Sequence, residues 1–421
     1  MEIKEALDYI NGAHWFGAEA SLRRIRELMG LLGDPQKKLK FVHIAGTNGK
    51  GSCAAMTASV LRACGYRTGL YTSPYLYRFN ERMQVNGEMI EDEALCRHVA
   101  AVREKAEKMD EHPTEFELMT AVAMLYFLEE QCDIVVLEVG LGGRFDATNV
   151  IEKSECSIIM NIGLDHTAIL GDTAEAIAAE KAGIIKENCP CVLYEQKKSV
   201  MDVVSARGKE LDAPLRAADF SAIEPVFDSL EGQAFSYKGA MYALPLLGAH
   251  QLKNAAVVLE AAEVLRARGW KLDAGDVEHG LYAASWPGRF ELCAEEPDFV
   301  VDGGHNPQCA ETVADNLLRY FPEKKRVLLI GVLRDKDFVN LTNILAPCAD
   351  EFVTVAPDSP RALSAEELAA ALERYGKPVT PCGSVAEAVE TAKELAGEDG
   401  MVCAVGSLYL VGSVRYELGM Y

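Results

Sequence analysis

Residues 43–52 read His-Ile-Ala-Gly-Thr-Asn-Gly-Lys-Gly-Ser and join an apolar, β-type run (39–45) to an alanine-rich helical pattern that begins at Ser52. The three glycines allow a tight turn in which backbone N–H groups converge on an anion. The positive end of the following helix strengthens that field. Lys50 supplies a mobile positive charge, and Ser52 supplies a hydroxyl suited to Mg²⁺. The stretch therefore predicts a phosphate-binding loop for a nucleoside triphosphate.

The loop departs from the general pattern G-x-x-x-x-G-K-[ST] in two places. Ile44 stands five residues before Gly49, where the pattern has glycine, and Gly51 separates Lys50 from the hydroxyl residue. The alternative is an ordinary glycine-rich turn between a strand and a helix. We favour the phosphate loop because the lysine, the hydroxyl and both flanking elements agree.

Composition indicates a globular protein of two domains. The chain has 421 residues, which is too many for one ordinary hydrophobic core. Its residues are 25% charged and 49% hydrophobic, as in folded proteins. The formal net charge of −22 argues against a general nucleic-acid partner, because nothing offsets the repulsion between the protein and phosphates. Few apolar stretches are available for association, so we expect a monomer.

Targeting and redox signals predict a cytoplasmic protein. The first nine residues lack the apolar core of a signal peptide, and no apolar run approaches the length of a membrane span. The 12 cysteines are scattered without a C-x-x-C pair. Cys189 and Cys191 form the only close pair, and we interpret them as buried thiols rather than as a metal site. Free thiols without an export signal are typical of the cytoplasm, and we expect no membrane partner.

Alternating apolar runs and helical patterns in the first half predict a parallel α/β sheet. We expect strands at 39–45, 67–72, 133–139, 155–162 and 190–194, and helices at 52–64, 91–109, 115–131 and 172–186. Asp172, with Glu175 three residues later, is the predicted N-cap of the last helix. Short alternating runs at 222–247, with turns at Glu231-Gly232 and Lys238-Gly239, predict a small antiparallel sheet, and a helix at 250–268 follows.

The α/β pattern restarts after the segment Ser285-Trp-Pro-Gly-Arg289. The expected strands lie at 298–302, 326–331, 350–355 and 401–405, and the expected helices at 308–320, 364–374 and 385–396. We therefore predict a three-layer phosphate-loop ATPase-like domain with a small antiparallel sheet (1–285), a linker (286–289) and a C-terminal dinucleotide-fold-like α/β domain (290–421). The second domain has no phosphate loop of its own, so we expect it to cover a site built by the first.

Polar side chains follow the expected strands at their carboxyl ends, where α/β proteins bind ligands. Glu138 ends an apolar strand and is costly to bury alone, so we interpret it as a Mg²⁺ ligand, with a structural salt bridge as the alternative. His166 can complete a Mg²⁺ shell, although a structural histidine is the alternative. Ser73 can reach the same region, or can simply form a Ser-Pro turn.

Lys181 lies on the predicted helix after His166. A buried lysine can lose its proton and can then react with CO₂ to form a carbamate, which is an anionic oxygen ligand. The residues by themselves leave an exposed helix lysine as the alternative. In the second half, Asp302 and His305 again follow a strand, and Arg289 in the linker is a cation that can reach phosphates when the domains close.

Taken together, these motifs closely resemble those of the folylpolyglutamate synthase/dihydrofolate synthase family of the Mur ligase superfamily. The matching runs are His43–Ser52, Thr72–Leu76, Phe79–Gly87, Glu138–Asn149, Leu164–His166, Glu180–Lys186, Gly248–Asn254, Pro287–Glu291, Asp302–Pro307 and Pro360–Ala362. They span nearly the whole chain in family order, and the Gly-Lys-Gly-Ser ending of the loop is the form that this family shows. Residues 17–21 depart from the family's more distinctive turn near the pterin.

The resemblance implies an ATP-dependent amide ligase. In the family, a carboxylate of the substrate attacks the γ-phosphate of ATP, and the amino group of glutamate then attacks the acyl phosphate. The implied substrates are ATP, L-glutamate, and a folate or dihydropteroate.

The resemblance also implies roles for individual residues. ATP would be held by Gly49, Lys50, Gly51, Ser52, Asn254, Arg289 and Asp302. Mg²⁺ would be held by Ser73, Glu138 and His166, with a second Mg²⁺ supported by carbamylated Lys181. His305 would sit near the γ-phosphate, so that Lys181, His305 and Lys50 are the catalytic candidates. The pterin substrate would be met by Thr114, Glu115, Phe116, Glu117, Phe145, Asp146 and Ala147.

Two other hypotheses stay open at this point. One is a Mur-type ligase that acts on a UDP-linked cell-wall peptide precursor, which lacks support because no additional UDP-binding domain precedes the loop at residue 46. The other is a phosphate-loop binding module without ligase chemistry, which would leave Arg289 and Asp302 of the second half without a role.

Overall fold

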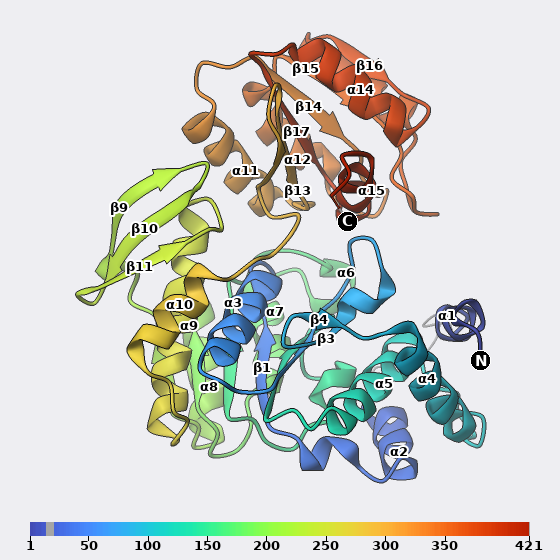
Figure 1. Cartoon of the computed structure of the whole chain (residues 1–421), viewed down its shortest axis with the longest axis vertical. Coiled ribbons are helices and arrows are strands. Elements are labelled where there is room, and N and C mark those ends of the chain that lie inside the picture. The colour runs from blue at the N-terminus through green and yellow to red at the C-terminus, as the bar shows by residue number, and fades with distance from the viewer. Residues whose placement is uncertain (14–20, 421) are drawn as a thin grey trace.

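The computed structural model describes residues 1–13 and 21–420 of the chain. Figure 1 shows a larger lower part that contains the N-terminal half (1–285) and an upper part that contains the C-terminal half (290–421), with a small sheet beside their junction. The last helix, α15 (Leu408–Glu417), lies on the underside of the upper part, near the junction. No helix in the described part of the chain is long and apolar enough to span a bilayer.

The N-terminal half contains an eight-stranded sheet in the order β4-β3-β2-β5-β1-β6-β7-β8. The strands are β1 (Phe41–Ala45), β2 (Thr68–Tyr71), β3 (Met83–Val85), β4 (Glu88–Met89), β5 (Ile134–Glu138), β6 (Cys156–Ile159), β7 (Cys191–Leu193) and β8 (Leu215–Ala217). All neighbours from β2 to β8 pair in parallel, and the β3–β4 hairpin adds an antiparallel edge. The strand that leads into the phosphate loop therefore lies in the interior of the sheet.

Helices cover both faces of this sheet, which confirms the predicted three layers. They are α1 (Ile3–Asn11), α2 (Arg23–Leu31), α3 (Lys50–Ala63), α4 (Asp92–Ala106), α5 (Glu115–Glu129), α6 (Thr167–Leu170), α7 (Ala174–Lys181), α8 (Lys198–Glu210), α9 (Ala249–Ala267) and α10 (Ala274–Tyr282). Val42 and Ile44 pack into the core of α3, α9 and α10, whereas Phe41 packs into the core of α2, α4 and α5. Successive side chains of β1 thus enter opposite cores, as expected of a parallel strand buried on both faces.

The small sheet packs against the N-terminal core. It consists of β9 (Ile223–Ser229), β10 (Gly232–Tyr237) and β11 (Ala240–Leu244), all antiparallel, and has the turns predicted from the sequence. Phe235 is fully buried in the same core as α9.

The C-terminal half is a second α/β unit with strand order β12-β13-β17-β14-β15-β16. Its strands are β12 (Glu291–Ala294), β13 (Asp298–Asp302), β14 (Arg326–Ile330), β15 (Glu351–Thr354), β16 (Val379–Pro381) and β17 (Met401–Val405). Its helices are α11 (Pro307–Tyr320), α12 (Phe338–Leu345), α13 (Ala365–Leu372), α14 (Val385–Ala396) and α15 (Leu408–Glu417). Only β12 is antiparallel to its neighbour, so the predicted α/β class of this half is confirmed.

The predicted helix at 172–186 is wrong at both ends. Thr173, not Asp172, is the N-cap of α7, and its hydroxyl accepts a hydrogen bond from the N–H of Ala176 at 3.2 Å. The helix ends at Lys181, and a short 3₁₀ turn follows. There Gly183 lies directly against the backbone of Arg144, where a Cβ would come within 2.6 Å of the Arg144 Cα. Tertiary contact with the 140–146 loop thus replaces the local helical pattern.

Candidate functional site

The phosphate loop leaves β1 between the carboxyl ends of β5 and β6. Ile44 is paired with Glu138, the last residue of β5, and Ala45 is paired with Ile159, the last residue of β6. A backbone hydrogen bond fixes the loop to the segment after β6, since the N–H of Thr47 donates to the carbonyl of Asn161 at 2.8 Å. Because all these strands are parallel, their carboxyl ends form one edge at which a ligand can bind.

Two glycines of the loop are required by their surroundings. Gly49 has φ +82°, and a Cβ there would lie 2.9 Å from the Asn254 side-chain oxygen. A Cβ at Gly51 would lie 2.8 Å from the indole nitrogen of Trp286. Glycine at position 51, which is irregular for a general phosphate loop, therefore admits an aromatic ring from the linker.

Helix α9 supplies a polar contact to the start of α3. Gln251 donates to the hydroxyl of Ser52 at 3.2 Å, and Asn254 donates to the Gln251 side-chain oxygen at 2.9 Å. The ammonium of Lys50 donates to the carbonyl of Thr47 at 3.3 Å. The structure thus brings together the predicted ATP residues Gly49, Lys50, Gly51, Ser52 and Asn254.

Glu138 lies buried beside the loop, with only 4% of its surface exposed. Burial raises the pKa of its carboxyl, and the charges of Lys50 and Arg289 oppose that shift. The backbone N–H of Ser73 donates to Glu138 at 3.2 Å, so Ser73 and Glu138 are neighbours as predicted. A buried carboxylate beside a hydroxyl and a phosphate loop suits a hard cation such as Mg²⁺.

Lys181 is buried at the other side of the loop, with 4% of its surface exposed, and donates to the carbonyl of Gly46 at 2.8 Å. Burial and then the charge of Lys50 lower the pKa of its ammonium group to about 7. The alternative that Lys181 is an exposed lysine on a helix is therefore wrong.

His166 is more open, and 41% of its side chain is exposed. Its Nε2 lies 3.8 Å from Asp165 and 3.4 Å from the ammonium of Lys336. Burial, followed by the charge of Lys336, lowers the pKa of His166 to about 4, so that the ring is neutral at pH 7. The hydrogen bonds and ion pairs of the described residues do not link His166 to Ser73 or Glu138, and no three His, Cys, Asp or Glu side chains converge within 1–13 and 21–420.

The C-terminal half contributes polar groups from the end of β13. Asp302 is buried and accepts hydrogen bonds from the N–H groups of Phe290 at 2.9 Å and Gly304 at 2.7 Å. Burial raises the pKa of its carboxyl, and the charge of Arg289 opposes that shift. His305 lies 3.6 Å from Asp165 across the junction.

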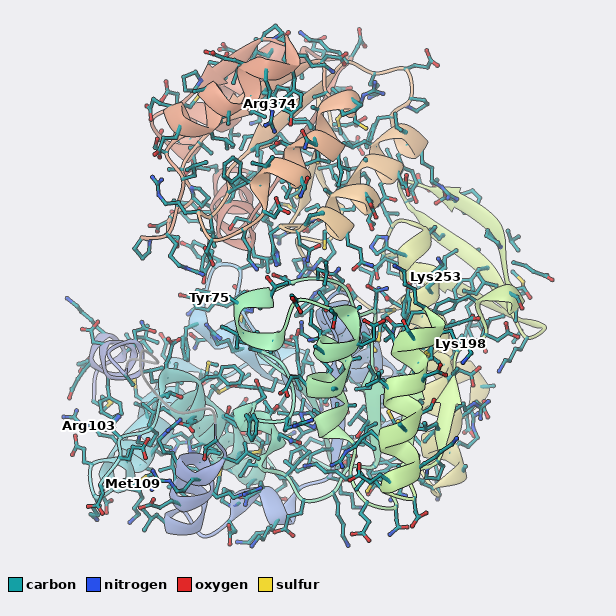
Figure 2. All side chains as sticks on the ribbon, turned by 180° about the vertical axis from the view of Figure 1, so that it is seen from behind. Tyr75, Arg103, Met109, Lys198, Lys253 and Arg374 are labelled. Carbon is teal, nitrogen blue, oxygen red and sulfur yellow. The ribbon has the colours of Figure 1, made fainter. Side chains whose placement is uncertain are left out.

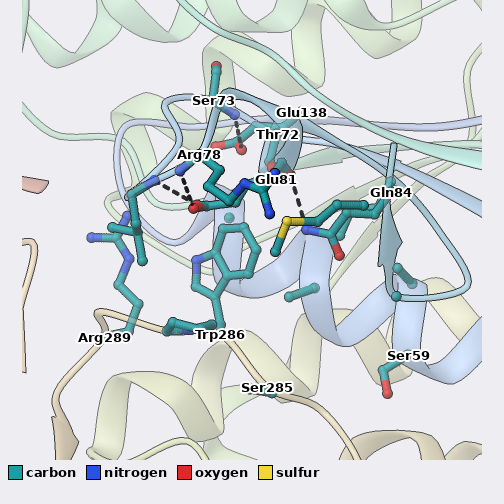
Figure 3. A pocket seen from close by; sticks show the side chains of 18 of the residues that line it. Ser59, Thr72, Ser73, Arg78, Glu81, Gln84, Glu138, Ser285, Trp286 and Arg289 are labelled. Carbon is teal, nitrogen blue, oxygen red and sulfur yellow. Dashed lines mark hydrogen bonds between the residues drawn. The ribbon is translucent and has the colours of Figure 1, made fainter. Parts of the chain in front are cut away.

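A cavity of about 350 Å³ opens between the halves at this point. In Figure 3, Ser73 and Glu138 lie on one wall, and Trp286 and Arg289 rise from the linker on the other. The indole N–H of Trp286 is buried without a hydrogen-bond partner among the described residues. A wider groove of about 1140 Å³ is lined by Asp165, His166, His305, Lys336 and Lys253. Figure 2, which shows the molecule from behind, labels Lys253 near the junction of the two halves.

Most of the predicted pterin residues are occupied by contacts within the fold. Thr114 caps α5, and Glu117 accepts from the Thr114 N–H at 2.8 Å and from the Arg24 guanidinium at 3.0 Å. Phe116 packs against Gly140, where a Cβ would lie 2.5 Å from its ring.

The second predicted pterin segment has one open side chain. Asp146 is buried and accepts from the N–H groups of Gly140 at 3.1 Å and Leu141 at 2.9 Å, so its carboxylate shapes the loop after Glu138. Ala147 is also buried, whereas Phe145 is 48% exposed. Glu115 is half-buried at the start of α5. Residues 17–20, which depart from the family pattern, lie outside the described residues.

Comparison with known proteins identifies the family. The model described as "Mur ligase middle domain" matches residues 44–262, and that described as "Mur ligase, glutamate ligase domain" matches residues 288–408. The dihydrofolate synthase/folylpolyglutamate synthase of Bacillus subtilis is 37% identical over 428 residues, which cover 99% of each chain. The chain belongs to the folylpolyglutamate synthase/dihydrofolate synthase family.

Other members agree in sequence and in structure. The dihydrofolate synthase/folylpolyglutamate synthase of Escherichia coli is 34% identical over 97% of this chain and 93% of its own. The structure of the folylpolyglutamate synthase of Mycobacterium tuberculosis complexed with ADP and AMPPCP has a TM-score of 0.90 at 32% identity, and the match covers 99% of this chain and 98% of that one. The resemblance drawn from the motifs is confirmed, and the Mur-type alternative has less support.

Several polar residues that the structure places at the candidate site are not among those predicted from the sequence. Gln251 lies within a matching run, yet its contact with Ser52 cannot be read from that run. Asp165 and Lys336 meet across the junction at 2.9 Å from positions 171 residues apart. A signal was available for Asp165, because it directly precedes His166 at the end of the strand.

Proposed function

We propose that this chain is an ATP-dependent ligase that adds L-glutamate to the carboxylate of a folate and also to dihydropteroate. One observation carries the proposal: Gly51 of the phosphate loop, a buried carboxylate (Glu138) and an arginine of the linker (Arg289) line the same cavity. Phosphate loops occur in many proteins, but a cation that approaches the loop from the linker between the halves suits transfer of a phosphoryl group to an anionic acceptor.

The charges of the site suit the first step, in which a substrate carboxylate attacks the γ-phosphate. Two anions must approach each other, although the whole chain carries a formal charge of −22. Lys50 and Arg289 offset that repulsion locally and stabilise the charge on the moving phosphoryl group. Arg289 makes no hydrogen bond or ion pair with any residue of the described chain, so its guanidinium is available for ATP.

Mg²⁺ fits the residues around Glu138. The raised pKa of Glu138 reflects a buried charge without a full partner, and the hydroxyl of neighbouring Ser73 is a suitable additional donor. His166, whose ring is neutral, lines the wider groove and would have to approach this ion from there. When bound, Mg²⁺ would neutralise phosphate charge. Glu138 would hold the ion, and Ser73 would orient that carboxylate through its N–H.

We also propose that Lys181 is carbamylated and supports a second Mg²⁺. With a pKa of about 7, much of this side chain is the neutral amine at neutral pH. Its nitrogen can form a bond to the carbon of CO₂ and release one proton, which leaves an anionic carbamate. Mass spectrometry of the peptide that contains Lys181, with and without bicarbonate, tests this. An unmodified lysine under both conditions would contradict it.

The test of the proposed function is turnover. Purified protein is incubated with ATP, Mg²⁺ and L-glutamate, with dihydropteroate or tetrahydrofolate added or omitted, while ADP and product masses are followed. We expect ADP release to require the pteroate or folate, and the product to gain one glutamyl unit for each ADP. ADP release that is independent of both acceptors would refute the proposal, and turnover with only one would show a monofunctional enzyme.

A further inference from the structure

The side chain of Asn48, in the phosphate loop, is engaged entirely by the C-terminal half. Its amide nitrogen donates to the side-chain oxygen of Gln308 at 2.7 Å. Its amide oxygen accepts from the side-chain nitrogen of Asn306 at 3.0 Å and lies 3.2 Å from the thiol of Cys309. One amide therefore uses both its donor and its acceptor across the junction.

The partners of Asn48 are the first residues of α11, next to His305. Asn306 caps this helix, since its side-chain oxygen accepts from the N–H of Cys309 at 2.9 Å, and only 4% of its surface is exposed. Displacing Asn306 from Asn48 would thus displace the start of α11 and the histidine before it.

The loop does not need this side chain for its own shape. Backbone N–H groups of Thr47 and Asn48 donate to the carbonyl of Asn161, at 2.8 and 3.3 Å. The N–H of Cys53 donates to the carbonyl of Gly49 at 2.9 Å, as the first turn of α3 requires. The contact of Asn48 with α11 is therefore an additional feature that joins two halves, each of which has its own core.

We propose that Asn48 is a positioning residue that holds α11 and His305 against the phosphate loop and so keeps water away from the acyl phosphate until glutamate attacks it. This inference rests on the proposed function. If the halves separate, water can take the place of the amine. Its oxygen bonds to the acyl carbon or to phosphorus, the acyl phosphate breaks, and the original carboxylate and free phosphate are produced. ATP is then consumed without a product.

The consequence of losing this amide can be measured. The two amide hydrogen bonds, at typical net strength, correspond to a fall of about 30-fold in the closed-to-open ratio. For Asn48→Ala we expect ligation kcat to fall about 10-fold, the ratio of ADP released to glutamylated product to rise about 3-fold or more, and the KM for ATP to change less than about 3-fold.

Gln308→Ala removes the partner of the amide nitrogen and leaves the loop sequence intact. We expect the same rise in the ADP-to-product ratio as for Asn48→Ala. Because both changes break the same contact, the double variant should show a smaller effect than the sum of the two single variants. Gln308→Ala also keeps the inference testable if Asn48→Ala folds poorly. An ADP-to-product ratio that stays near that of the wild type in both variants overturns the inference.

Arg319→Ala is the matched control. Arg319 lies at the far end of the same helix, α11, and pairs with Asp228 of the small sheet, so its loss loosens the same helix away from the loop. We expect the ADP-to-product ratio of Arg319→Ala to equal that of the wild type. If this ratio rises as much as in Asn48→Ala, any loosening of α11 has the same effect, and the inference is overturned. Wild-type protein that makes no glutamylated product would instead defeat the proposed function, and the inference with it.

Discussion

Glu138 and Lys181 are ionisable side chains buried on either side of the candidate phosphate loop. Burial raises the pKa of the carboxyl and lowers the pKa of the ammonium, so each charged form is disfavoured in the ligand-free protein. Neither group has the full ion pair that would compensate for its burial. Burial of these two groups therefore carries an electrostatic cost, which the proposed ligands, Mg²⁺ and CO₂, would relieve.

The first prediction concerns Glu138→Gln. The amide keeps the size of the side chain and removes a disfavoured charge, so we expect the ligand-free protein to melt at a higher temperature at pH 7. We also expect ligation to fall by at least about 100-fold, because the proposed Mg²⁺ ligand is lost. Thermal unfolding and turnover are measured together, with the exposed Glu187→Gln as control. A variant that is less stable than the wild type would contradict this reading of Glu138.

The second prediction is a pH dependence caused by Lys181. Its pKa is about 7 in the folded protein, compared with an ordinary value of 10.5. Between these values the unfolded chain binds the proton and the folded chain does not, so the free energy of unfolding rises with pH, by at most about 1.4 kcal/mol per pH unit. Lys181→Met should remove this contribution and flatten the dependence between pH 7 and 10.

Urea unfolding in CO₂-free buffer measures that slope. Lys4→Met, which changes an exposed lysine, is the control and should keep the wild-type slope. If the Lys181→Met and wild-type slopes are equal, Lys181 keeps its proton in the folded protein, and the carbamate proposal loses its chemical basis.

At the scale of elements, the segment after β2 docks on α15 of the other half. Gly412 of α15 faces the carbonyl of Leu76 so closely that a Cβ would overlap it. The aromatic rings of Tyr77 and Tyr416 stack nearby, with centroids 5.0 Å apart. Because Ser73 lies in the same segment, this contact also positions a proposed metal ligand.

The third prediction is that Gly412→Ala destabilises the protein. Alanine normally favours a helix over glycine by about 1 kcal/mol. Here the Cβ must displace the Leu76 backbone, at a cost of about 1–3 kcal/mol. Gly30→Ala in α2, where a Cβ meets nothing within 4 Å, is the matched control and should be neutral or stabilising. Melting temperatures test the pair, and a stabilising Gly412→Ala would show that α15 and the segment are not in close contact.

At the scale of the whole molecule, Asp165 and Lys336 join the halves next to the predicted metal site. Their side chains are 13% and 11% exposed. Burial raises the pKa of the Asp165 carboxyl, but the hydrogen bond from His305 and the charge of Lys336 outweigh it and hold that pKa below its ordinary value. A shielded pair of this kind is costly to break from one side only.

The fourth prediction follows from that asymmetry. Lys336→Met should lower ligation by about 10-fold or more, and Asp165→Asn together with Lys336→Met should cost less than the two single changes combined. Turnover and melting temperature are measured for all three proteins. Lys324→Met breaks an ion pair with Asp298 within the C-terminal half and should leave turnover unchanged. Additive effects of the two single changes would show that the pair does not couple the halves.

Much of the fold was readable from local patterns. The central strands β1, β5 and β6 are short, apolar runs, and their predicted ranges agree with the structure within a few residues. Less apolar elements were missed, such as α8, in which only Val200, Val204 and Gly208 are buried. The cap of α7 was misplaced because Asp172 and Thr173 are both suitable residues and only the folded backbone selects one.

The candidate site divides in a similar way. The sequence nominates the loop, Glu138, Ser73 and Lys181 as site residues, because each stands at the carboxyl end of a predicted strand or within a matching run. Their roles stay predictions. The sequence does not predict the protonation state of these groups, because the burial of Lys181 depends on how α7 packs against the loop. The monomeric state, the cytoplasmic location and the boundaries at 285 and 290 stay predictions.

By itself, the sequence determined the family, the class of each half and the position of the candidate phosphate loop. These depend on residue type, spacing and order, which are local properties of the chain. Only the tertiary structure decided that Asn48 is held by α11, that Asp165 meets Lys336, and that Glu138 and Lys181 are buried. Such contacts join residues far apart in the chain, and burial depends on everything packed around a group, so no local pattern encodes them.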